Sequence, residues 1–367
     1  MTVGRRRLLA TAGTAIAGGC LTSPRRRSAL DTDRYDHEDG TVVGFVGDVM
    51  LGRNLDECYG DGGRDPASVW SGVRPRLESL DGVFCNLECT LSTRGERFPD
   101  RAYYFRADPA WAVPALDGAN VRFAALANNH LLDFGEPALR DTLAALDDGG
   151  IAHAGAGETA TDARRPALVT VGDVDVAVVS FADHYAEYAA TADRSGTAYL
   201  ECDPENPDTR AAVDDALERA SERDPDLLVA SLHWGPNWVE YPDDRYREFG
   251  RWLIDRGVDL VHGHSAHVVQ GVERYGEGVI LHDAGDFVDD YVVKPELRND
   301  RSFLYEVRLG DDGNLEQLRL VPVVIDDYAV HAATDADASW LHETMRERSA
   351  PFDTSYERDG DDLLLSL

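Results

Sequence analysis

Short apolar runs, each followed closely by a carboxylate, an amide or an imidazole, constrain the fold of this 367-residue chain most strongly. The runs are rich in β-branched residues, which predicts buried strands. They cover residues 41–47, 83–86, 121–127, 227–232, 258–261 and 279–282. Apolar residues at helical spacing lie between several of the runs, at 135–148, 207–222 and 246–256, and two hairpins are expected at 167–181 and 303–325. This order predicts an α/β fold, a layered sandwich with mixed β-sheets flanked by helices.

The chain is long enough for one large domain or two ordinary ones. Residues 41–330 contain neither an internal repeat nor a linker, so we expect one domain there. Residues 331–367 are expected to be an acidic C-terminal extension, with a helix followed by a frayed end.

The charge balance of the chain argues against nucleic-acid binding. The chain has 36 Lys and Arg against 68 Asp and Glu, a net charge of −32, with Lys294 as its one lysine. Binding to phosphate backbones needs clustered cations, so no nucleic-acid partner is expected. Acidic residues spread along the whole chain favour a salt-adapted, halophilic surface. The alternative is an acidic patch for a cationic partner.

The N-terminus has the layout of an export signal. Three arginines at 5–7 precede an apolar run at 8–17, and small residues lead to Cys20. The paired arginines predict the twin-arginine route for residues 1–20. The segment before Cys20 is similar to a lipobox, which predicts a lipid anchor on Cys20; the alternative is a signal cut without lipid. Residues 21–40 are expected to be a flexible tether, and the protein is predicted to lie at the extracellular face of the membrane.

Four further cysteines are expected to be buried free thiols, and the alternative is that they pair as disulfides outside the cell; no CxxC motif marks them as zinc ligands. They are Cys58, Cys85, Cys89 and Cys202.

Potential ligands follow the predicted strands, at the edge where α/β sheets place their sites. They are Asp48, Glu88, Asn128, Asn129, His130, His233, His262, His264, His267, His282, Asp283 and Asp286. Mixed carboxylate, amide and imidazole ligands suit Mn²⁺, Fe²⁺ or Zn²⁺, so one or two divalent ions are predicted per chain. His282 and Asp286 are additional candidates in this set. The alternative is that these side chains only cap strands and bond to loops.

Six ordered motifs carry a resemblance to a known family. They are GDVMLGR (47–53), NLE (86–88), NNHLLDFG (128–135), HWG with EYP (233–242), GHSAHVVQG (263–271) and AGDFVDDY (284–291). Their order over about 41–325 resembles the CapA family of capsule or poly-γ-glutamate biosynthesis proteins, which are related to calcineurin-like metallophosphoesterases. The resemblance implies a metallophosphatase-like fold.

The resemblance also implies roles for the early motifs. Asp48 is similar to the first-motif aspartate, a terminal ligand of one ion, and Glu88 to the acidic residue that bridges two ions. Asn129 and His130 are similar to the Asn-His pair of the phosphoesterases. In that pair the asparagine binds the second ion, and the histidine orients substrate or protonates the leaving group.

The later motifs supply the remaining implied ligands. His233, His264 and His267 are similar to the histidine ligands of the relatives. Arg53 and Asn128 are expected to contact substrate, Arg53 through a two-pronged bond to an anionic group. The alternative for Arg53 is a salt bridge to a nearby acid.

Some positions depart from the family pattern. Met50 stands where the phosphoesterases carry the histidine of Asp-x-His, so one ion lacks a ligand, and Glu88 replaces a bridging Asp. Residues 265–267 read Ser-Ala-His where the late motif of many CapA sequences is His-Pro-His, so His264 must take over the lost role or the second site is weakened. Asp286 stands where many relatives carry Asn, so it either offsets the missing histidine or bonds to the backbone.

Two functions follow as hypotheses. The first is an exported, metal-dependent hydrolase in capsule or poly-γ-glutamate synthesis, acting on an anionic surface polymer or its precursor with His130 as acid. The second is a non-catalytic polymer-binding or assembly subunit, working with membrane synthase subunits of a synthesis or export complex.

Overall fold

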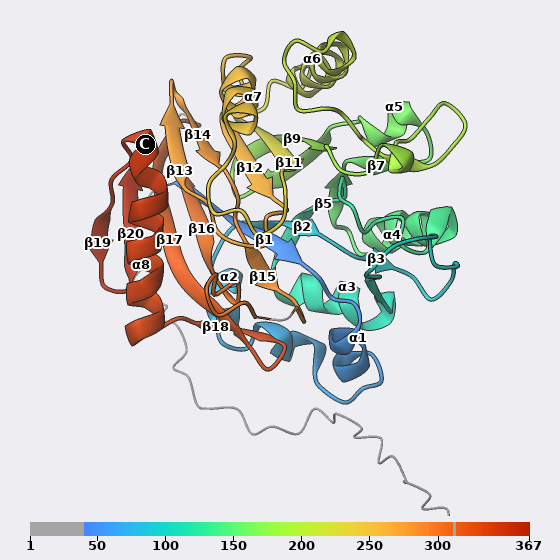
Figure 1. Cartoon of the computed structure of the whole chain (residues 1–367), viewed down its shortest axis with the longest axis horizontal. Helices are drawn as coiled ribbons and strands as arrows, with labels where there is room; N and C mark the ends of the chain where they lie inside the picture. Colours follow the sequence, from blue (N-terminus) through green and yellow to red (C-terminus); the bar gives the residue numbers. More distant parts are fainter. Residues whose placement is uncertain (1–39, 292, 311–312) are drawn as a thin grey trace, which may run out of the picture.

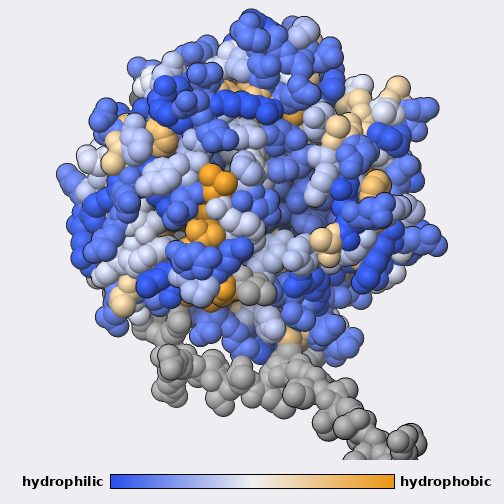
Figure 2. Space-filling model, in the orientation of Figure 1, coloured by the Kyte–Doolittle hydropathy of each residue, from blue (hydrophilic) through white to orange (hydrophobic). Residues whose placement is uncertain are grey.

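A computed structural model describes residues 40–291, 293–310 and 313–367 (Figure 1). The predicted signal, the lipid site at Cys20 and nearly all of the predicted tether lie outside the described residues. Among the described residues, no helix combines the length and the apolar character needed to cross a lipid bilayer. Hydrophilic residues cover most of the face seen in Figure 2, with apolar residues in scattered patches.

The larger sheet is mixed and has ten strands in the order β19-β20-β17-β16-β1-β2-β5-β6, with β15 beside β1 and β18 beside β17. Its strands are β1 (Thr41–Val49), β2 (Gly82–Leu87), β5 (Val121–Ala125), β6 (Ala152–Ala154), β15 (Asp286–Val288), β16 (Arg301–Leu309), β17 (Leu315–Asp326), β18 (Ala329–Ala332), β19 (Glu357–Asp359) and β20 (Asp362–Ser366). Strands β2 and β15 run parallel to β1, whereas β16 runs antiparallel to it.

The smaller sheet is also mixed, with six strands in the order β13-β14-β12-β11-β9-β8. Its strands are β8 (Ala167–Val171), β9 (Val174–Ala182), β11 (Leu227–His233), β12 (Leu260–His264), β13 (Val272–Tyr275) and β14 (Gly278–Leu281). Strands β9, β11, β12 and β14 are parallel, so their carboxyl ends lie at one edge. Two-stranded ladders join β3 (Thr90–Leu91) to β4 (Arg106–Ala107) and β7 (Ala156–Gly157) to β10 (Gly196–Thr197).

The helices are α1 (Asn54–Tyr59), α2 (Arg74–Glu78), α3 (Pro109–Gly118), α4 (Gly135–Asp148), α5 (Ala160–Ala163), α6 (Pro207–Ser221), α7 (Asp244–Ile254) and α8 (Asp335–Ser349). Helices α6 and α7 cover the outer face of the smaller sheet, α3 and α4 lie beside β5 and β6 of the larger sheet, and α8 packs against β17, β16 and β13 (Figure 1). Three short 3-10 turns are η1 (Pro66–Trp70), η2 (Ala186–Tyr188) and η3 (Ala350–Phe352).

Three apolar clusters hold these layers together, and β1 shows how the sequence builds them. Val43 and Phe45 point into the cluster between the two sheets, whereas Val42 and Val46 point into the cluster under the helices of the larger sheet. This alternation follows from the two-residue period of a strand. A third cluster lies between the smaller sheet and α6 and α7. The predicted α/β sandwich of mixed sheets flanked by helices is therefore confirmed.

The C-terminal segment continues the larger sheet. Helix α8 forms as expected, but the frayed end predicted after it is wrong, because β20 pairs with β17 from Leu320↔Leu363 to Gln317↔Ser366. Apolar residues at 363 and 365 point into the cluster between the sheets, which holds this strand in place.

The cysteines agree in part with expectation. Cys85, Cys89 and Cys202 are buried free thiols. Burial raises the pKa of the Cys89 thiol to about 12, so this thiol stays protonated. Cys58 is buried as well but is not a free thiol, which corrects the expectation for that residue.

A buried ion pair joins α2 to β16. Arg76 donates from Nε and Nη2 to the two carboxylate oxygens of Glu306, at 2.5 and 2.7 Å, and both side chains are almost fully buried. Removing one partner of such a pair leaves an uncompensated charge in a low-dielectric interior.

We therefore expect Arg76→Met to lower the free energy of unfolding by roughly 3–5 kcal/mol. The matched control is Arg74→Met, two residues away, which breaks an exposed pair with Glu78 and should cost less than about 1 kcal/mol. Denaturant unfolding at fixed salt measures both. Equal losses in the two variants would contradict a special role for the buried pair.

Candidate metal centre

The centre is built around the end of β1, where Asp48 is fully buried. In the parallel ladders of β1, Asp48 stands opposite Asn86 on β2 and opposite Asp286 on β15. Gly47 makes this possible, because a Cβ there would lie 1.8 Å from the carbonyl oxygen of Gly285. The amide of Asp48 donates to that same oxygen at 2.9 Å, so β15 can approach only a glycine.

The smaller sheet supplies imidazoles from its matching edge. His233 ends β11 and His264 ends β12, and the two residues are paired in register. Their Nδ1 atoms are 3.0 Å apart, and Nδ1 of His264 lies 3.8 Å from Oδ1 of Asp48. Ser231 Oγ lies 3.0 Å from Nε2 of His264 and orients the ring. The two sheets therefore place their polar ends against each other.

Two groups of buried side chains have ligand atoms close enough to hold a cation. One group is Asp48, His233 and His264, and the other is Asp48, Glu88 and His267; within each, the ligand atoms lie within 4.8 Å of one another. Asp48 is therefore the shared member. Oε1 of Glu88 also lies 3.8 Å from Nε2 of His233, so the expected bridging role of Glu88 stays a prediction.

Electrostatics within the centre favour a bound cation. Although burial opposes it, the neighbouring carboxylates Asp286 and Glu88 raise the pKa of His267 well above its ordinary value. Burial and the charge of Asp48 raise the pKa of Glu88 well above its ordinary value. Burial and His264 lower the pKa of His233 well below its ordinary value. The carboxylates are close together and bind protons more readily than usual. A divalent ion bound here would take the place of those protons.

Buried polar atoms without hydrogen-bond partners also gather here. They include Asp48 Oδ2, both carboxylate oxygens of Glu88, Asn129 Oδ1, His233 Nε2 and Asp286 Oδ2. Buried polar atoms in folded proteins are usually satisfied, so such a set needs an explanation. Carboxylate, amide and imidazole donors are the ligands of Mn²⁺, Fe²⁺ and Zn²⁺, and the residues present fit such an ion.

His130 lies beside the centre and is held by a carboxylate. Its Nδ1 is 2.7 Å from Oδ2 of Asp133, which also accepts the amide of Phe105 at 2.7 Å. Because an ionised carboxylate only accepts, Nδ1 carries the proton and Nε2 faces the centre. That Nε2 lies 3.9 Å from Oε1 of Glu88.

Asn128 has a supporting position, which corrects the expected substrate contact. Its Nδ2 donates to Oδ1 of Asn86 and to the carbonyl of Leu87, and its Oδ1 accepts the amide of His130. Both amide hydrogens are therefore used within the protein, and the side chain fixes the loop that carries His130.

His282 was expected as an additional ligand, and the structure does not bring it into the centre. Its Nε2 lies 2.9 Å from Oε2 of Glu273, and its ring stacks on Phe352 with centroids 4.7 Å apart. Asp286 does reach the centre, with Oδ1 2.8 Å from Nδ1 of His267.

Arg53 lies at the mouth of the centre. Its Nε donates to Oδ2 of Asp290 at 3.1 Å, and its guanidinium lies 5.0 Å from the ring centroid of Phe105, which packs on His130. The salt bridge that was an alternative for Arg53 is therefore present. It also fixes the guanidinium one aromatic ring away from His130.

Sequence reasoning missed three supporting residues. Asn86 donates to Oδ1 of Asp48 at 2.7 Å, Asp133 orients His130, and His184 packs on the ring of His233 with centroids 5.2 Å apart. Asn86 and Asp133 lie inside the quoted motifs NLE and NNHLLDFG, so their positions were a usable signal. His184 follows β9 just as His233 follows its own strand, and the strand-end pattern could have included it.

Several residues around the centre have a strained backbone. Arg53, Tyr185, Trp238, Ser265 and His267 all have positive φ, from 56° to 115°. Residues other than glycine adopt this region at a cost of order 1–3 kcal/mol each, and such residues cluster at functional sites. The late motif therefore depends on surrounding packing to hold His267 in place.

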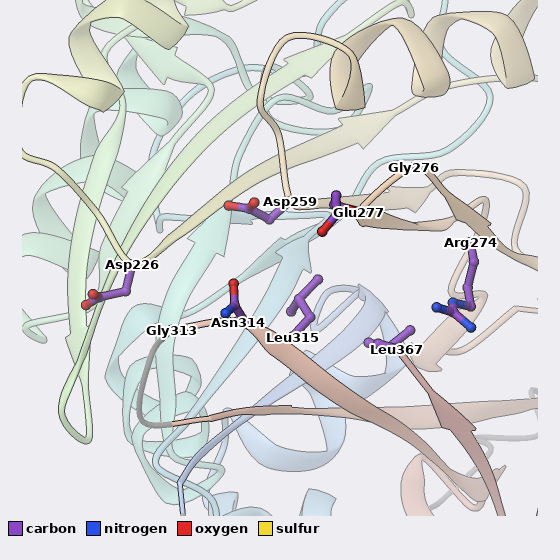
Figure 3. Close-up of a pocket in the computed structure, with 10 residues that line it drawn as sticks. Asp226, Asp259, Arg274, Gly276, Glu277, Gly313, Asn314, Leu315 and Leu367 are labelled. Carbon is purple, nitrogen blue, oxygen red and sulfur yellow. The ribbon is translucent and has the colours of Figure 1, made fainter.

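A separate pocket of about 360 Å³ lies at the opposite edge of the sheets (Figure 3). Asp226 and Asp259 line it and directly precede β11 and β12, at the amino ends of these strands. The predicted ligands lie at the carboxyl ends, so this pocket is not part of the centre.

The fold and the site define an α/β sandwich protein with a buried carboxylate–imidazole centre between the carboxyl edges of two sheets. The chain belongs to the family described as bacterial capsule synthesis protein PGA_cap, whose family model matches residues 42–291. The family resemblance drawn from the motifs is thereby confirmed.

Curated relatives span most of the chain. A probable polyglutamine synthesis accessory protein of Mycobacterium tuberculosis is 34% identical over 89% of this chain and 96% of its own. The capsule biosynthesis protein CapA of Bacillus anthracis is 28% identical over 85% of this chain and 74% of its own, and the PGA biosynthesis protein CapA of Bacillus subtilis is 28% identical over 69% and 64%. A 5'-nucleotidase from Candida albicans has a TM-score of 0.43 at 9% identity over 87% of this chain and 60% of that chain, too low to establish a shared fold.

Metal stoichiometry tests the sharing of Asp48. Because Asp48 belongs to both groups and Glu88 to one, Asp48→Asn should abolish binding of both ions, whereas Glu88→Gln should leave the ion held by His233 and His264. Plasma mass spectrometry after Mn²⁺ or Zn²⁺ loading measures the content, with Asp259→Asn at the opposite edge as control. Full retention in Asp48→Asn would contradict this assignment.

The pH dependence of stability follows from the buried imidazoles. Burial lowers the pKa of His262 to about 4, and its Nε2 donates to the carbonyl of Val46 at 3.0 Å. The unfolded state therefore binds the extra proton first. Stability should be complete above about pH 6.5 and fall by roughly 3 kcal/mol toward pH 4 from this residue alone.

Denaturant unfolding in EDTA at fixed salt measures this dependence between pH 7 and pH 4. His262→Gln should flatten the curve, whatever its effect on stability at pH 7. An unchanged slope in that variant would show that other groups carry the acid sensitivity.

Proposed function

We propose that this chain acts in the synthesis of an anionic amino-acid surface polymer of the poly-γ-glutamate type, as a metal-dependent hydrolase of the polymer or its precursor. The names of the relatives support the polymer, and the motif set of the family supports the chemistry. The observation that carries the proposal is the buried centre on Asp48, with partnerless ligand atoms on Glu88 and His233 and with His130 beside it.

The chain's own residues would each have a defined part. Asp48, Glu88, His233, His264 and His267 would hold Mn²⁺, Fe²⁺ or Zn²⁺, with Asn129 and Asp286 as further oxygen ligands. When bound, such ions supply Lewis-acid polarisation and water activation.

His130 is placed to give a proton to the leaving group. The Asp133 carboxylate accepts its Nδ1–H, so the doubly protonated imidazolium form would carry the transferable proton on Nε2, which faces Glu88. Phe105 packs edge-on against the ring at 4.6 Å and fixes its orientation. Arg53, on the other side of Phe105, would hold a carboxylate of the polymer.

We also propose that the protein is exported and held at the outer face of the membrane by lipid on Cys20, in a salt-adapted organism. The arginine-rich start, the apolar run before Cys20 and the dispersed acidic residues support this location. Partners there would be the polymer and membrane synthase subunits.

One observation favours a second candidate function, a non-catalytic subunit that binds or assembles the polymer. Met50 is fully buried where the related phosphoesterases carry a histidine ligand, so each group has only three firm ligands among the described residues.

Cleavage of purified poly-γ-glutamate by the purified protein with Mn²⁺, Fe²⁺ or Zn²⁺ tests the first function. His130→Gln should lower the rate by about 10²–10⁴-fold, the usual contribution of a general acid, and Asp133→Asn should lower it less. His153→Gln is a matched control, since it removes a partly exposed histidine paired with Asp147.

Polymer size by gel filtration and new amine ends give the rate. No cleavage with any of the three ions, together with loss of surface polymer on gene deletion, would reject the hydrolase and favour the assembly subunit.

A further inference from the structure

A polar pocket of about 710 Å³ opens beside the centre, at the carboxyl ends of β9 and β11. We call it the acidic pocket, because four carboxylates line it. Its polar wall comprises Asp183, Glu201, Asp203, Asp243, Tyr199 and Tyr246. None of these residues belongs to the predicted ligand set.

His184 separates the acidic pocket from the centre. It lines the pocket, its ring packs on His233 with centroids 5.2 Å apart, and its Nε2 lies 3.0 Å from Oγ of Ser265. Asp183 is tied to the same strand end, since its amide donates to the carbonyl of His233 at 3.2 Å. A group bound in the pocket would therefore lie next to the centre.

Asp183 is the feature that points to a ligand. Its side chain is only 6% exposed, Oδ2 accepts the hydroxyl of Tyr246 at 2.9 Å, and Oδ1 is buried without a hydrogen-bond partner. Among the described residues, the side chain recorded near Oδ1 is that of His184, whose Nε2 is 3.4 Å away but is directed at Ser265. A buried carboxylate oxygen that accepts no hydrogen bond is costly, so a ligand that donates a hydrogen bond to Oδ1 would relieve this cost.

Charge balance in the pocket agrees with this. Arg245 is its one lining arginine, and Nε of that residue is engaged by the carbonyl of Cys202 at 2.9 Å. Within the described part of the chain, none of the four carboxylates forms an ion pair with an arginine, whereas surface acids such as Glu136 pair with one. Four carboxylates therefore share the pocket with one arginine, which leaves the lining with a net negative charge.

Tyr246 and Gly235 shape the wall. The pKa of Tyr246 is raised by burial and by Asp183, so its hydroxyl remains a donor. Gly235 has φ +79°, and a Cβ there would lie 3.4 Å from the ring of Tyr246. The guanidinium of Arg245 lies 5.4 Å from the centroid of the same ring, so the tyrosine contributes its hydroxyl rather than a free ring face.

We propose that the acidic pocket binds a primary ammonium group, namely the free amino end of an amino-acid polymer chain. Three N–H donors on a compact positive charge match Asp183 Oδ1 and the outer carboxylates of the pocket. This inference rests on the proposed function for the identity of the chain. It adds that the protein works at the amino end of the polymer rather than at internal positions.

The test uses a γ-linked glutamate dimer with a free amine and the same dimer N-acetylated. Binding is measured by calorimetry on the full chain, in EDTA and at one fixed concentration of KCl. The free dimer should bind at least about tenfold more tightly, the scale of one charge-assisted hydrogen bond. Asp183→Asn should remove the preference, and Asp147→Asn on an exposed distant site should keep it.

Several outcomes would overturn the proposal. Equal binding of the two dimers would do so, and so would an unchanged preference in Asp183→Asn. If butylamine bound as tightly as the free dimer, the pocket would recognise any free amine and not the end of the polymer. Stabilisation by K⁺ but not by tetramethylammonium, lost in Asp183→Asn, would assign the pocket to an alkali ion instead.

If Asp183→Asn fails to fold, Asp243→Asn replaces it, since this carboxylate is exposed on the pocket wall and should reduce the preference about two- to threefold. Because the assay contains no divalent ion, its result is independent of hydrolysis. Hydrolysis without an amine preference rejects the pocket alone, and an amine preference without hydrolysis rejects the hydrolase alone.

Discussion

The position of Asp48 is the constraint on which the rest of the structure depends. Strand β1 pairs with three strands, and the missing side chain at Gly47 lets β15 close over its end. The backbone register of these ladders then places Asn86 and Asp286 opposite Asp48. Facing imidazoles from the smaller sheet complete a buried set of charges that neither sheet could stabilise alone.

Much of the fold could be predicted because its central strands are apolar and its turns are marked by glycine. The predicted 121–127, 227–232 and 303–309 runs correspond to β5, β11 and β16. Strands β15, β18 and β19 could not be predicted, because each is only three or four residues long. Period-two patterning over so few residues carries no usable signal.

The strand ends were enough to predict the candidate ligands, but they did not predict which ligand belongs to which group. Which carboxylate is shared by the two groups depends on the register between β1 and its neighbours, and sequence spacing does not contain that register. Asn128 shows the same limit, since hydrogen bonds to Asn86 and Leu87 use an amide that the motif alone suggested was free. His184 follows β9 by two residues, so the strand-end pattern could have included it, but its packing on His233 depends on the pairing of β9 with β11.

Side chains of opposite charge lie on the two sides of the centre. Arg53 lies on the side of Phe105 and His130, whereas Asp183 lies on the side of His184 and His233. In a chain with a net charge of −32, a cation held by a buried carboxylate at the mouth is a specific arrangement rather than a feature of the general surface. Under the proposed function, a polymer with carboxylates along its length and one ammonium at its end would match this polarity in only one orientation. Charge would then supply the specificity that a largely anionic surface otherwise denies to an anionic ligand.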